Sequence, residues 1–342
     1  MPKITRLNIS MAERQNKNVE DLPKVLVLGL HKCYASIIPH YSHKFHFLDP
    51  KLSGLSLHHF IVAHNHQPSS IPAILCSTTY SISADVLRLL PSLRLVVTTS
   101  SGTDHIDLNE CRRRGIQVAA AGGVFSEDVA DMAVALLIDV VRKISAGDRY
   151  LRTQNHSTCL DFPLVDSKLS CKRVGIVGLG SIGMEVAKRL EGFGCIISYH
   201  SKHQKAVSYP FFSNVTELAT TCNALVVCCA LNEETKHIIN KDVILALGKE
   251  GFIVNVGRGA LIDEKQLVKC LMEGQIGGAG LDVFENEPRV PEELLEMNNV
   301  VLSAHHAAAT AESKILLIEL VIGNLEAFFS NKPLISPVIL VE

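Results

Sequence analysis

The sequence predicts an α/β protein whose parallel strands are joined by helical crossovers and divided between about two domains. Three observations lead to this fold class. Short apolar runs alternate with helix-like stretches from Pro23 to about Val118, a second alternation begins near Cys171, and the strand-like runs of the second half are almost continuously apolar. Such runs are typical of parallel strands that helices cover on both faces. The 342 residues, of which 47% are hydrophobic, suffice for two sizeable cores.

The first half begins with a polar tail and continues with strands and helices in turn. Residues 1–22 lack the apolar stretch of a secretory signal and predict a loosely ordered tail. Strands are expected in the runs KVLVLG, AILCSTT, LRLVVTT and GIQVAAA, and helices in ISADVLRLLPSL and DLNECRRRG. A long connecting helix is expected over residues 126–151, with Ser126, Glu127 and Asp128 in its first turn.

The second half repeats the alternation more regularly. Strands are expected in the runs CKRVGIVG, CIISYHS, ALVVCCA, FIVNVG, GAGLDVF and NVVLSA, with helices between them. After His306 the pattern predicts one last amphipathic helix and a proline-bearing tail without further strands.

Charge and cysteine content exclude several kinds of partner. The formal net charge of -2 gives no basic field for nucleic acid, and the Arg112–Arg114 cluster is interpreted as a solvated helix end. The most apolar stretches are broken by Asp131, Asp139 and Glu319, so no membrane span is predicted. The ten cysteines show no C-x-x-C spacing, which argues against a zinc site or a disulfide framework. We therefore expect a cytoplasmic protein without a metal ion and without a nucleic-acid or membrane partner.

A glycine motif begins the second half and predicts a dinucleotide site. Gly178, Gly180 and Gly183 follow the strand run in GIVGLGSIGMEVAKRL, and a helix and another strand complete the unit. Glycines let the pyrophosphate approach backbone N–H groups, and the start of the helix favours negative charge. Ser181 and Ile182 of the same loop are included in the predicted cofactor site. The alternative is that these glycines serve only the turn.

The end of the next strand favours NADPH over NADH. An acidic residue there would bind the ribose 2′-hydroxyl and repel a 2′-phosphate, but residues 195–216 contain no Asp or Glu. Instead, Ser201 offers a hydroxyl and Lys202 a cation to a phosphate. NADH remains possible, because Lys202 and Lys205 could equally be solvated surface charges.

Three strand ends of the second half carry ionisable residues that suit the reduction of a 2-oxo acid. Arg258 follows FIVNVG, Glu285 and Glu287 follow GAGLDVF, and His305 and His306 follow NVVLSA. Because ligands of parallel α/β sheets bind beyond the carboxyl ends of strands, these residues are expected to meet. An arginine can hold a carboxylate, a histidine can donate a proton, and a carboxylate can orient the histidine and raise its pKa.

With these motifs the chain resembles the D-isomer-specific 2-hydroxyacid dehydrogenases. The resemblance extends over nearly the whole chain after the tail and rests on TTSSGTDHIDL, VFSEDVAD, VGIVGLGSIG, NVGRGALIDEKQL, GLDVFENEP and VVLSAH. Within that family the sequence is most similar to plant glyoxylate and hydroxypyruvate reductases and to hydroxyphenylpyruvate reductases.

The resemblance assigns roles to individual residues. It implies that Arg258 binds the substrate, that His305 is the acid/base, and that Glu287 is the partner of that histidine. It also implies that backbone N–H groups around Ser101 and Gly102 help to hold the substrate carboxylate. Glu285 and His306 are then left without a direct role.

The resemblance also implies an arrangement of domains. A Rossmann cofactor domain at residues 125–306 would be inserted into a flavodoxin-like, doubly wound substrate domain formed by residues 23–124 and 307–342. Asp282 is added to the cofactor-binding candidates, and the connecting helix is expected to take part in a homodimer.

The chain departs from the family pattern around the histidine. Ala304 stands where proline is usual, and Ala307 and Ala308 stand where a Gly-Ser pair is usual. This change beside the nicotinamide leaves the substrate open within the 2-oxo acids. We expect an NADPH-preferring reductase of small 2-oxo acids such as glyoxylate and hydroxypyruvate. The alternatives are a hydroxyphenylpyruvate-type reductase of aryl 2-oxo acids and a non-enzymatic, dinucleotide-sensing protein like the corepressors of this fold.

Overall fold

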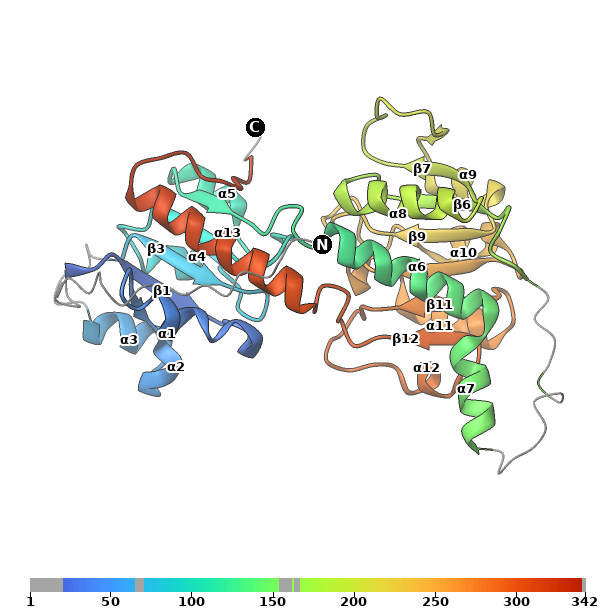
Figure 1. The fold of residues 1–342 in the computed structure, drawn as a ribbon, viewed down its shortest axis with the longest axis horizontal. Helices are drawn as coiled ribbons and strands as arrows, with labels where there is room; N and C mark the ends of the chain where they lie inside the picture. Colours follow the sequence, from blue (N-terminus) through green and yellow to red (C-terminus); the bar gives the residue numbers. More distant parts are fainter. Residues whose placement is uncertain (1–20, 65–70, 154–161, 163–166, 340–342) are drawn as a thin grey trace, which may run out of the picture. The chain divides into compact units, whose positions relative to one another are not determined.

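The computed structural model describes residues 21–64, 71–153, 162 and 167–339, which form two compact units (Figure 1). Unit 1 contains the described residues up to Thr99, His105–Ala120, and the chain from Leu320 onwards. Unit 2 contains Ser100–Asp104 and the described part of Ala121–Glu319. Most of the predicted polar tail, residues 1–20, lies outside the described residues.

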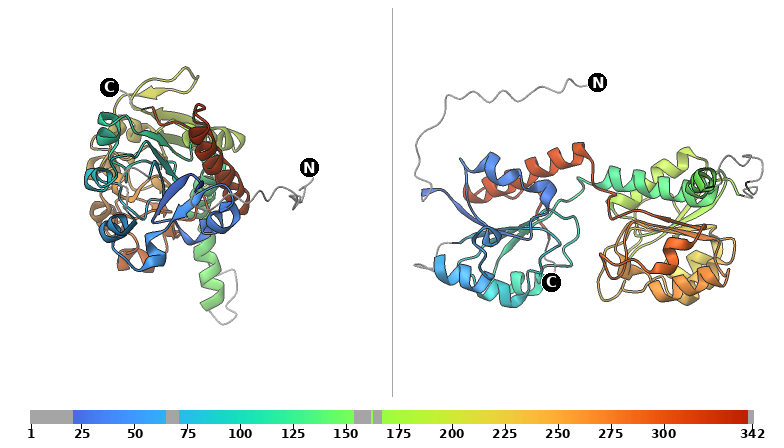
Figure 2. Two further views of the ribbon diagram at one scale, coloured as in Figure 1. Left: turned by 90° about the vertical axis from the view of Figure 1, so that its left-hand side faces the viewer. Right: turned by 90° about the horizontal axis from the view of Figure 1, so that it is seen from below.

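Unit 1 is a parallel five-stranded sheet with the order β2-β1-β3-β4-β5, which is the flavodoxin-like order (Figure 2). Its strands are β1 (Lys24–Leu28), β2 (His46–Leu48), β3 (Ala73–Cys76), β4 (Leu95–Thr98) and β5 (Gln117–Ala119). Its helices are η2 (Lys32–Tyr34), α1 (Ile37–Tyr41), α2 (Pro50–Ser53), α3 (Leu57–His64), α4 (Ala84–Arg88), α5 (Leu108–Arg113) and the second half of α13 (Ala311–Phe329).

The predicted elements of unit 1 are present because their sequence signals are local. The central strands β3 and β4 are buried along their whole length, as their unbroken apolar runs require. Helix α5 begins where the Asp107 carboxylate accepts the Glu110 N–H at 2.9 Å. Strand β2 was not predicted, because it is a three-residue edge strand in which only Leu48 is buried and which lacks an apolar run.

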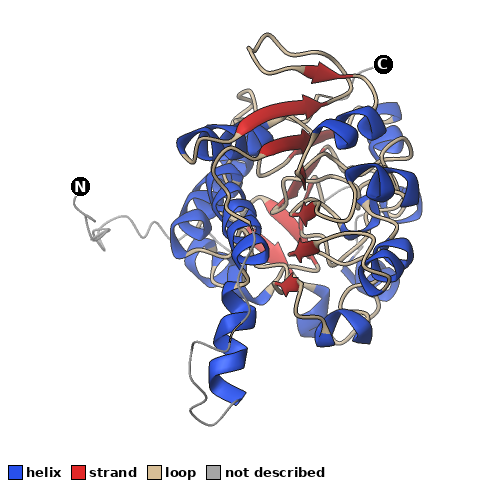
Figure 3. Cartoon of the chain, turned by 90° about the vertical axis from the view of Figure 1, so that its right-hand side faces the viewer, coloured by secondary structure: helices blue, strands red, loops and turns tan. Residues whose placement is uncertain are grey.

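Unit 2 is a parallel seven-stranded sheet with the order β12-β11-β10-β9-β6-β7-β8 and helices on both faces (Figure 3). Its strands are β6 (Arg173–Val177), β7 (Ile196–His200), β8 (Phe211–Phe212), β9 (Ala224–Val227), β10 (Phe252–Asn255), β11 (Gly278–Leu281) and β12 (Val300–Leu302). Its helices are α6 (Ser126–Arg142), α7 (Ile144–Thr153), α8 (Ser181–Gly192), α9 (Val215–Thr221), α10 (Lys241–Leu247), η5 (Gly259–Leu261), α11 (Glu264–Met272), α12 (Glu292–Glu296) and the first half of α13.

The strand order of unit 2 reverses at β6. The chain passes from β6 to β7 on one side and later returns to β9 on the other, so β6 is the point at which the order reverses. In doubly wound sheets the loops at such a point diverge and leave room for a ligand beyond the carboxyl ends of the strands. The order is that of the Rossmann fold with one added edge strand, which confirms the predicted fold class.

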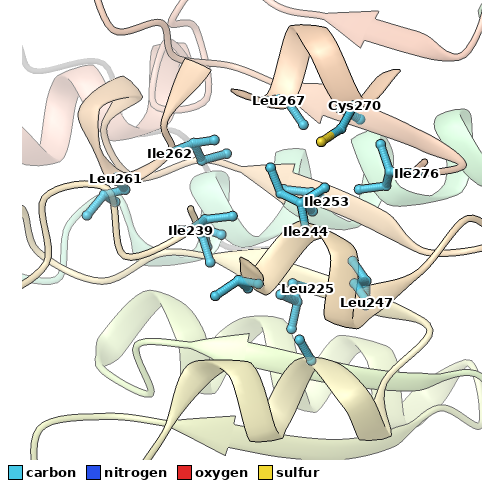
Figure 4. Packing of buried hydrophobic residues seen from close by; sticks show 14 of the residues in the cluster. Leu225, Ile239, Ile244, Leu247, Ile253, Leu261, Ile262, Leu267, Cys270 and Ile276 are labelled. Atoms are coloured by element: carbon cyan, nitrogen blue, oxygen red, sulfur yellow. The ribbon is translucent and has the colours of Figure 1, made fainter. Parts of the chain in front are cut away.

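An apolar cluster on one face of this sheet fixes the strands that carry the site (Figure 4). Leu225 of β9 and Ile253 of β10 pack against Ile244 of α10 and Leu267 of α11, and each is at most 1% exposed. Burying a side chain of this size contributes about 1.5–3 kcal/mol to folding. The packing of these buried side chains therefore fixes the positions of β9 and β10.

The prediction of one helix over residues 126–151 was wrong. Helices α6 and α7 are separated at Lys143, whose φ of 53° lies in the left-handed region. The Asp139 carboxylate accepts the Ser145 N–H at 2.8 Å and stabilises the break, an arrangement that helical periodicity does not reveal. None of the helices in the described ranges is long and apolar enough to cross a membrane.

Candidate active site

Three neighbouring strands of unit 2 bring the predicted catalytic residues together. Strands β10, β11 and β12 pair in parallel, so their carboxyl ends lie at one edge of the sheet. Arg258 follows β10, Glu287 lies in the loop after β11, and His305 follows β12. Arg258, Glu287 and His305 line one cavity of about 600 Å³.

His305 and Glu287 form a hydrogen-bonded pair. His305 Nδ1 lies 2.8 Å from Glu287 Oε2, and the other carboxylate oxygen accepts the Phe284 N–H at 3.0 Å. The hydrogen bond to Glu287 raises the pKa of His305, while burial and the Arg258 charge oppose the rise. Burial opposes ionisation of Glu287, but the hydrogen bonds from His305 and Phe284 outweigh it and lower its pKa. The pair therefore favours a protonated histidine beside an ionised carboxylate.

The backbone of His305 is held in an uncommon conformation by Asp282. His305 has a φ of 54°, and its N–H donates to the Asp282 carbonyl at 2.8 Å. The buried Asp282 carboxylate accepts the N–H groups of His306 at 2.9 Å and Ala307 at 3.1 Å. Left-handed backbone in a residue other than glycine persists where its surroundings hold it in place. Asp282, which was predicted to bind the cofactor, thus uses both carboxylate oxygens to hold the turn that presents His305.

Arg258 lies against the segment of residues 100–104. Its Nε is 3.3 Å from Asp104 Oδ1, and its Nη1 donates to the Gly257 carbonyl at 2.9 Å. A Cβ atom at Gly102 would lie 2.2 Å from Arg258 Nη2, so only glycine lets the guanidinium occupy this place. The sequence prediction named Arg258 and Gly102 but missed Asp104. Asp104 lies within the TTSSGTDHIDL motif, which was the available signal.

The predicted substrate-binding residues Ser101 and Gly102 are already engaged in hydrogen bonds of their own. The Gly102 N–H donates to Ser100 Oγ at 3.2 Å, and Ser101 Oγ donates to the Gly122 carbonyl at 3.0 Å. The Gly102 N–H would have to leave Ser100 in order to bind a substrate carboxylate. The segment does lie next to Arg258, and its role in substrate binding stays a prediction.

A second histidine–carboxylate pair supports the loop after β11. His237 Nε2 lies 2.8 Å from Glu285 Oε1, and the Glu285 N–H donates to Glu264 Oε2 at 3.0 Å. Burial raises the pKa of Glu264. Glu285, which sequence reasoning left without a role, thus ties the loop to two neighbouring segments. His237 was missed because it follows no strand and belongs to none of the motifs.

The glycine loop after β6 fits a bound pyrophosphate. Gly178 has a φ of 102°, and a Cβ atom there would lie 2.5 Å from the Cys229 backbone. A Cβ atom at Gly180 would meet nothing within 4 Å, so the packing of the protein does not explain that glycine. Helix α8 begins after Gly180 without a side-chain cap, leaving the first N–H groups of Ser181 and Ile182 for an anion.

The residues predicted to select NADPH lie on the loop after β7. Ser201 Oγ donates to the His203 carbonyl at 2.6 Å, and Lys202 Nζ lies 3.3 Å from Glu234 Oε2. Residues 195–216 contain no acid, but the carboxylate of Glu234 nevertheless lies beside Lys202. Glu234 belongs to the loop after β9, 32 positions further along the chain than Lys202. Within the described ranges, no cluster of three or more His, Cys, Asp or Glu residues could hold a metal ion.

Comparisons with known proteins agree with this geometry. The family model for the D-isomer specific 2-hydroxyacid dehydrogenase, NAD binding domain, matches residues 134–307. A glyoxylate/hydroxypyruvate reductase of Arabidopsis thaliana is 56% identical over 79% of this chain and 84% of its own. A hydroxyphenylpyruvate reductase of Plectranthus scutellarioides is 46% identical over 80% of this chain and 87% of its own.

A solved structure shows the same fold in a complex with its cofactor. The NADPH-dependent glyoxylate/hydroxypyruvate reductase of Sinorhizobium meliloti, in complex with NADP and malonate, matches with a TM-score of 0.83 and 32% identity. The match covers 93% of this chain and 97% of that one. These matches confirm the resemblance seen in the sequence motifs and identify a nicotinamide dinucleotide as the cofactor. The chain belongs to the D-isomer-specific 2-hydroxyacid dehydrogenase family.

Proposed function

We propose that the protein is an NADPH-preferring reductase that converts small 2-oxo acids such as glyoxylate and hydroxypyruvate to 2-hydroxy acids. The observation that carries the proposal is the His305–Glu287 pair, which lines one cavity with Arg258 in a chain with an NAD-binding domain. The names of the relatives described above support the same class of substrate.

The chain's own residues supply binding and proton transfer. Arg258 binds the substrate carboxylate through paired N–H groups and polarises the adjacent carbonyl. When bound, reduced nicotinamide supplies the hydride that adds to the carbonyl carbon. His305 donates a proton from Nε2 to the carbonyl oxygen while Glu287 holds Nδ1, so that one hydride and one proton yield the hydroxyl group. Glu287 stabilises the protonated imidazole before the transfer.

The glycine loop and the loop after β7 are proposed to bind the two ends of the cofactor. Backbone N–H groups at Gly180, Ser181 and Ile182 would contact the pyrophosphate. Ser201 and Lys202 would contact a 2′-phosphate, which supports NADPH over NADH. Asp282 would act on the cofactor indirectly, through the turn that carries His305 and Ala307.

An aryl 2-oxo acid is a second candidate substrate. The cavity of about 600 Å³ is also lined by the apolar residues Leu231, Phe284 and Pro288. Glyoxylate has no side chain that could use such walls, whereas a phenyl group could bury apolar surface against them.

A substrate panel tests these proposals. Purified protein would be assayed with glyoxylate, hydroxypyruvate and hydroxyphenylpyruvate, each with NADPH and NADH. We expect turnover with at least one of them and a higher kcat/KM with NADPH. No oxidation of either cofactor with any of these acids, together with nucleotide-dependent binding of another protein, would instead support a corepressor-like protein.

The domain roles, assembly and location follow the same proposal. Residues 125–306 would form the cofactor domain, and residues 23–124 with 307–342 the substrate domain. A cytoplasmic homodimer is proposed, without nucleic-acid or membrane partners. Its support is helix α7, on which Ile144 and Leu151 are both more than half exposed, an apolar surface that a second copy would cover. Light scattering after size-exclusion chromatography measures the assembly.

A further inference from the structure

The ion pair of Lys202 and Glu234 joins two loops that lie on either side of β6, the strand at which the order of the sheet reverses. Lys202 lies after β7 and Glu234 after β9, and these two strands flank β6 on opposite sides. The glycine loop follows β6 and therefore lies between the two loops that the pair joins. A dinucleotide held by the glycine loop would place its adenosine end beside these two loops, because dinucleotides bind at the switch point of this fold. The carboxylate of Glu234 is thus positioned against the cation that would bind a 2′-phosphate.

Internal hydrogen bonds hold both loops in place. The Tyr199 hydroxyl accepts the Lys205 N–H at 2.7 Å and closes the loop that contains Lys202. In the other loop Asn232 Oδ1 accepts the N–H groups of Glu234 and Thr235, both at 2.9 Å. The two backbones therefore present their charges toward each other from fixed positions, although the side chains are 70% and 71% exposed.

We propose that Glu234 is a selectivity residue that weakens the binding of NADPH relative to NADH. The inference rests on the proposed function in that the protein binds NADPH beside these loops. A 2′-phosphate must displace Glu234 from Lys202 and then bind close to a negative charge. NADH has a neutral hydroxyl at the same place, so it need not displace Glu234 and is not repelled by its charge. Glu234 thereby supplies, from a distant loop, part of the discrimination that an acidic residue after β7 would exert.

The expected effect is moderate because the groups are exposed. Breaking an exposed ion pair changes an equilibrium constant by about 1.4-fold to fivefold, and loss of the repulsion of the phosphate adds to this. We expect Glu234→Gln to lower the Kd for NADPH about threefold to tenfold. The Kd for NADH should change by less than about twofold, and the difference should shrink at high salt.

The neighbouring residues provide matched controls. Glu233 is an exposed acid next to Glu234 for which no side-chain partner is found in the described part of the chain. Glu233→Gln removes the same charge one residue away and should leave the NADPH/NADH ratio within about twofold. In a Lys202→Met background, Glu234→Gln should lose much of its effect, because the two residues act on the same phosphate.

The test is an equilibrium titration of the full-length variants with NADPH and NADH, followed by nicotinamide fluorescence. Titration with 2′-phospho-AMP and with AMP isolates the contribution of the phosphate. The proposal is supported if the affinity for NADPH divided by the affinity for NADH rises in Glu234→Gln but not in Glu233→Gln. An unchanged ratio, or an equal gain for both cofactors, overturns it. The wild-type ratio tests the proposed NADPH preference separately, because Glu234→Gln should shift the ratio from whatever value it has.

Discussion

The catalytic end and the cofactor-phosphate end of unit 2 share one edge of a sheet but differ in construction. At the catalytic end, Glu287 uses both oxygens in hydrogen bonds, and the carboxylate of the buried residue Asp282 holds the turn of His305. At the other end, Lys202 and Glu234 form a single ion pair in solvent. If the proposed roles hold, the contrast predicts that the chemistry depends on a preorganised, partly buried network, whereas cofactor preference depends on screened charges and is easily adjusted.

The largest expected effect is the loss of the proton donor. His305→Gln should lower kcat for reduction about 10²-fold to 10⁴-fold, the range typical of general acid catalysis. Because β12, which precedes His305, is separated by three strands from β6, which precedes the glycine loop, the Kd for NADPH should change little. Stopped-flow kinetics and cofactor titration measure the two quantities. His305→Asn is a useful second variant, since asparagine tolerates the φ of 54° at this position.

The adjacent histidine is the matched control for this prediction. The His306 N–H binds Asp282, but its ring is exposed. His306→Gln should keep most of the catalytic rate and mainly alter substrate preference. A similar loss of kcat in His305→Gln and His306→Gln would refute the assignment of His305 as the proton donor. It would also remove the proposed contrast between the catalytic end and the cofactor-phosphate end of unit 2.

A smaller, pH-dependent effect is expected at Glu287. Reduction requires protonated His305, so its rate is highest below the pKa of His305 and falls as pH rises through that pKa. Glu287 raises this pKa, and in Glu287→Gln burial and the Arg258 charge, which lower it, are opposed only by the smaller influence of the Asp282 charge. The alkaline limb of the reduction profile should therefore move to lower pH.

Oxidation of the 2-hydroxy acid provides a test of opposite sign. That direction needs unprotonated His305, so in Glu287→Gln its rate should begin to rise at a lower pH than in the wild type. Profiles of kcat/KM against pH in both directions check the prediction. If both profiles kept their wild-type limbs, Glu287 would not control the protonation of His305.

The smallest effect is expected at the phosphate end. Lys202→Asp replaces a cation with an anion and should raise the KM for NADPH about tenfold or more, while that for NADH stays within about threefold. Lys205→Asp is the control for this prediction, because it makes the same charge change three residues further along the loop. An equal rise in the KM for NADPH and for NADH in Lys202→Asp would contradict the proposed role of Lys202. It would also count against the proposed role of its partner Glu234.

Local patterns were enough to predict the strands and the residues that follow them. Unbroken apolar runs identified β3, β4, β9 and β10, and such runs made Arg258, Glu285, Glu287, His305 and His306 candidates. The resemblance to the family was needed to select Glu287 and His305 among them. The short strands β2 and β8 escaped prediction because two or three edge residues need little apolar surface. The break at Lys143 also escaped, because helix periodicity continues across it and a hydrogen bond from Ser145 to Asp139 stabilises it.

Contacts between distant segments account for what the sequence did not reveal. Asp104, His237 and Glu234 reach the site from 154, 48 and 32 positions away from their partners. No periodicity or spacing encodes such pairs, because they form only when strand order and loop conformation bring two segments together. The amino-acid sequence specifies which side chains stand at the carboxyl ends of the strands, since that depends on local apolar patterns. The folded chain specifies which charge faces which, since Coulomb and hydrogen-bond energies depend on distance in space.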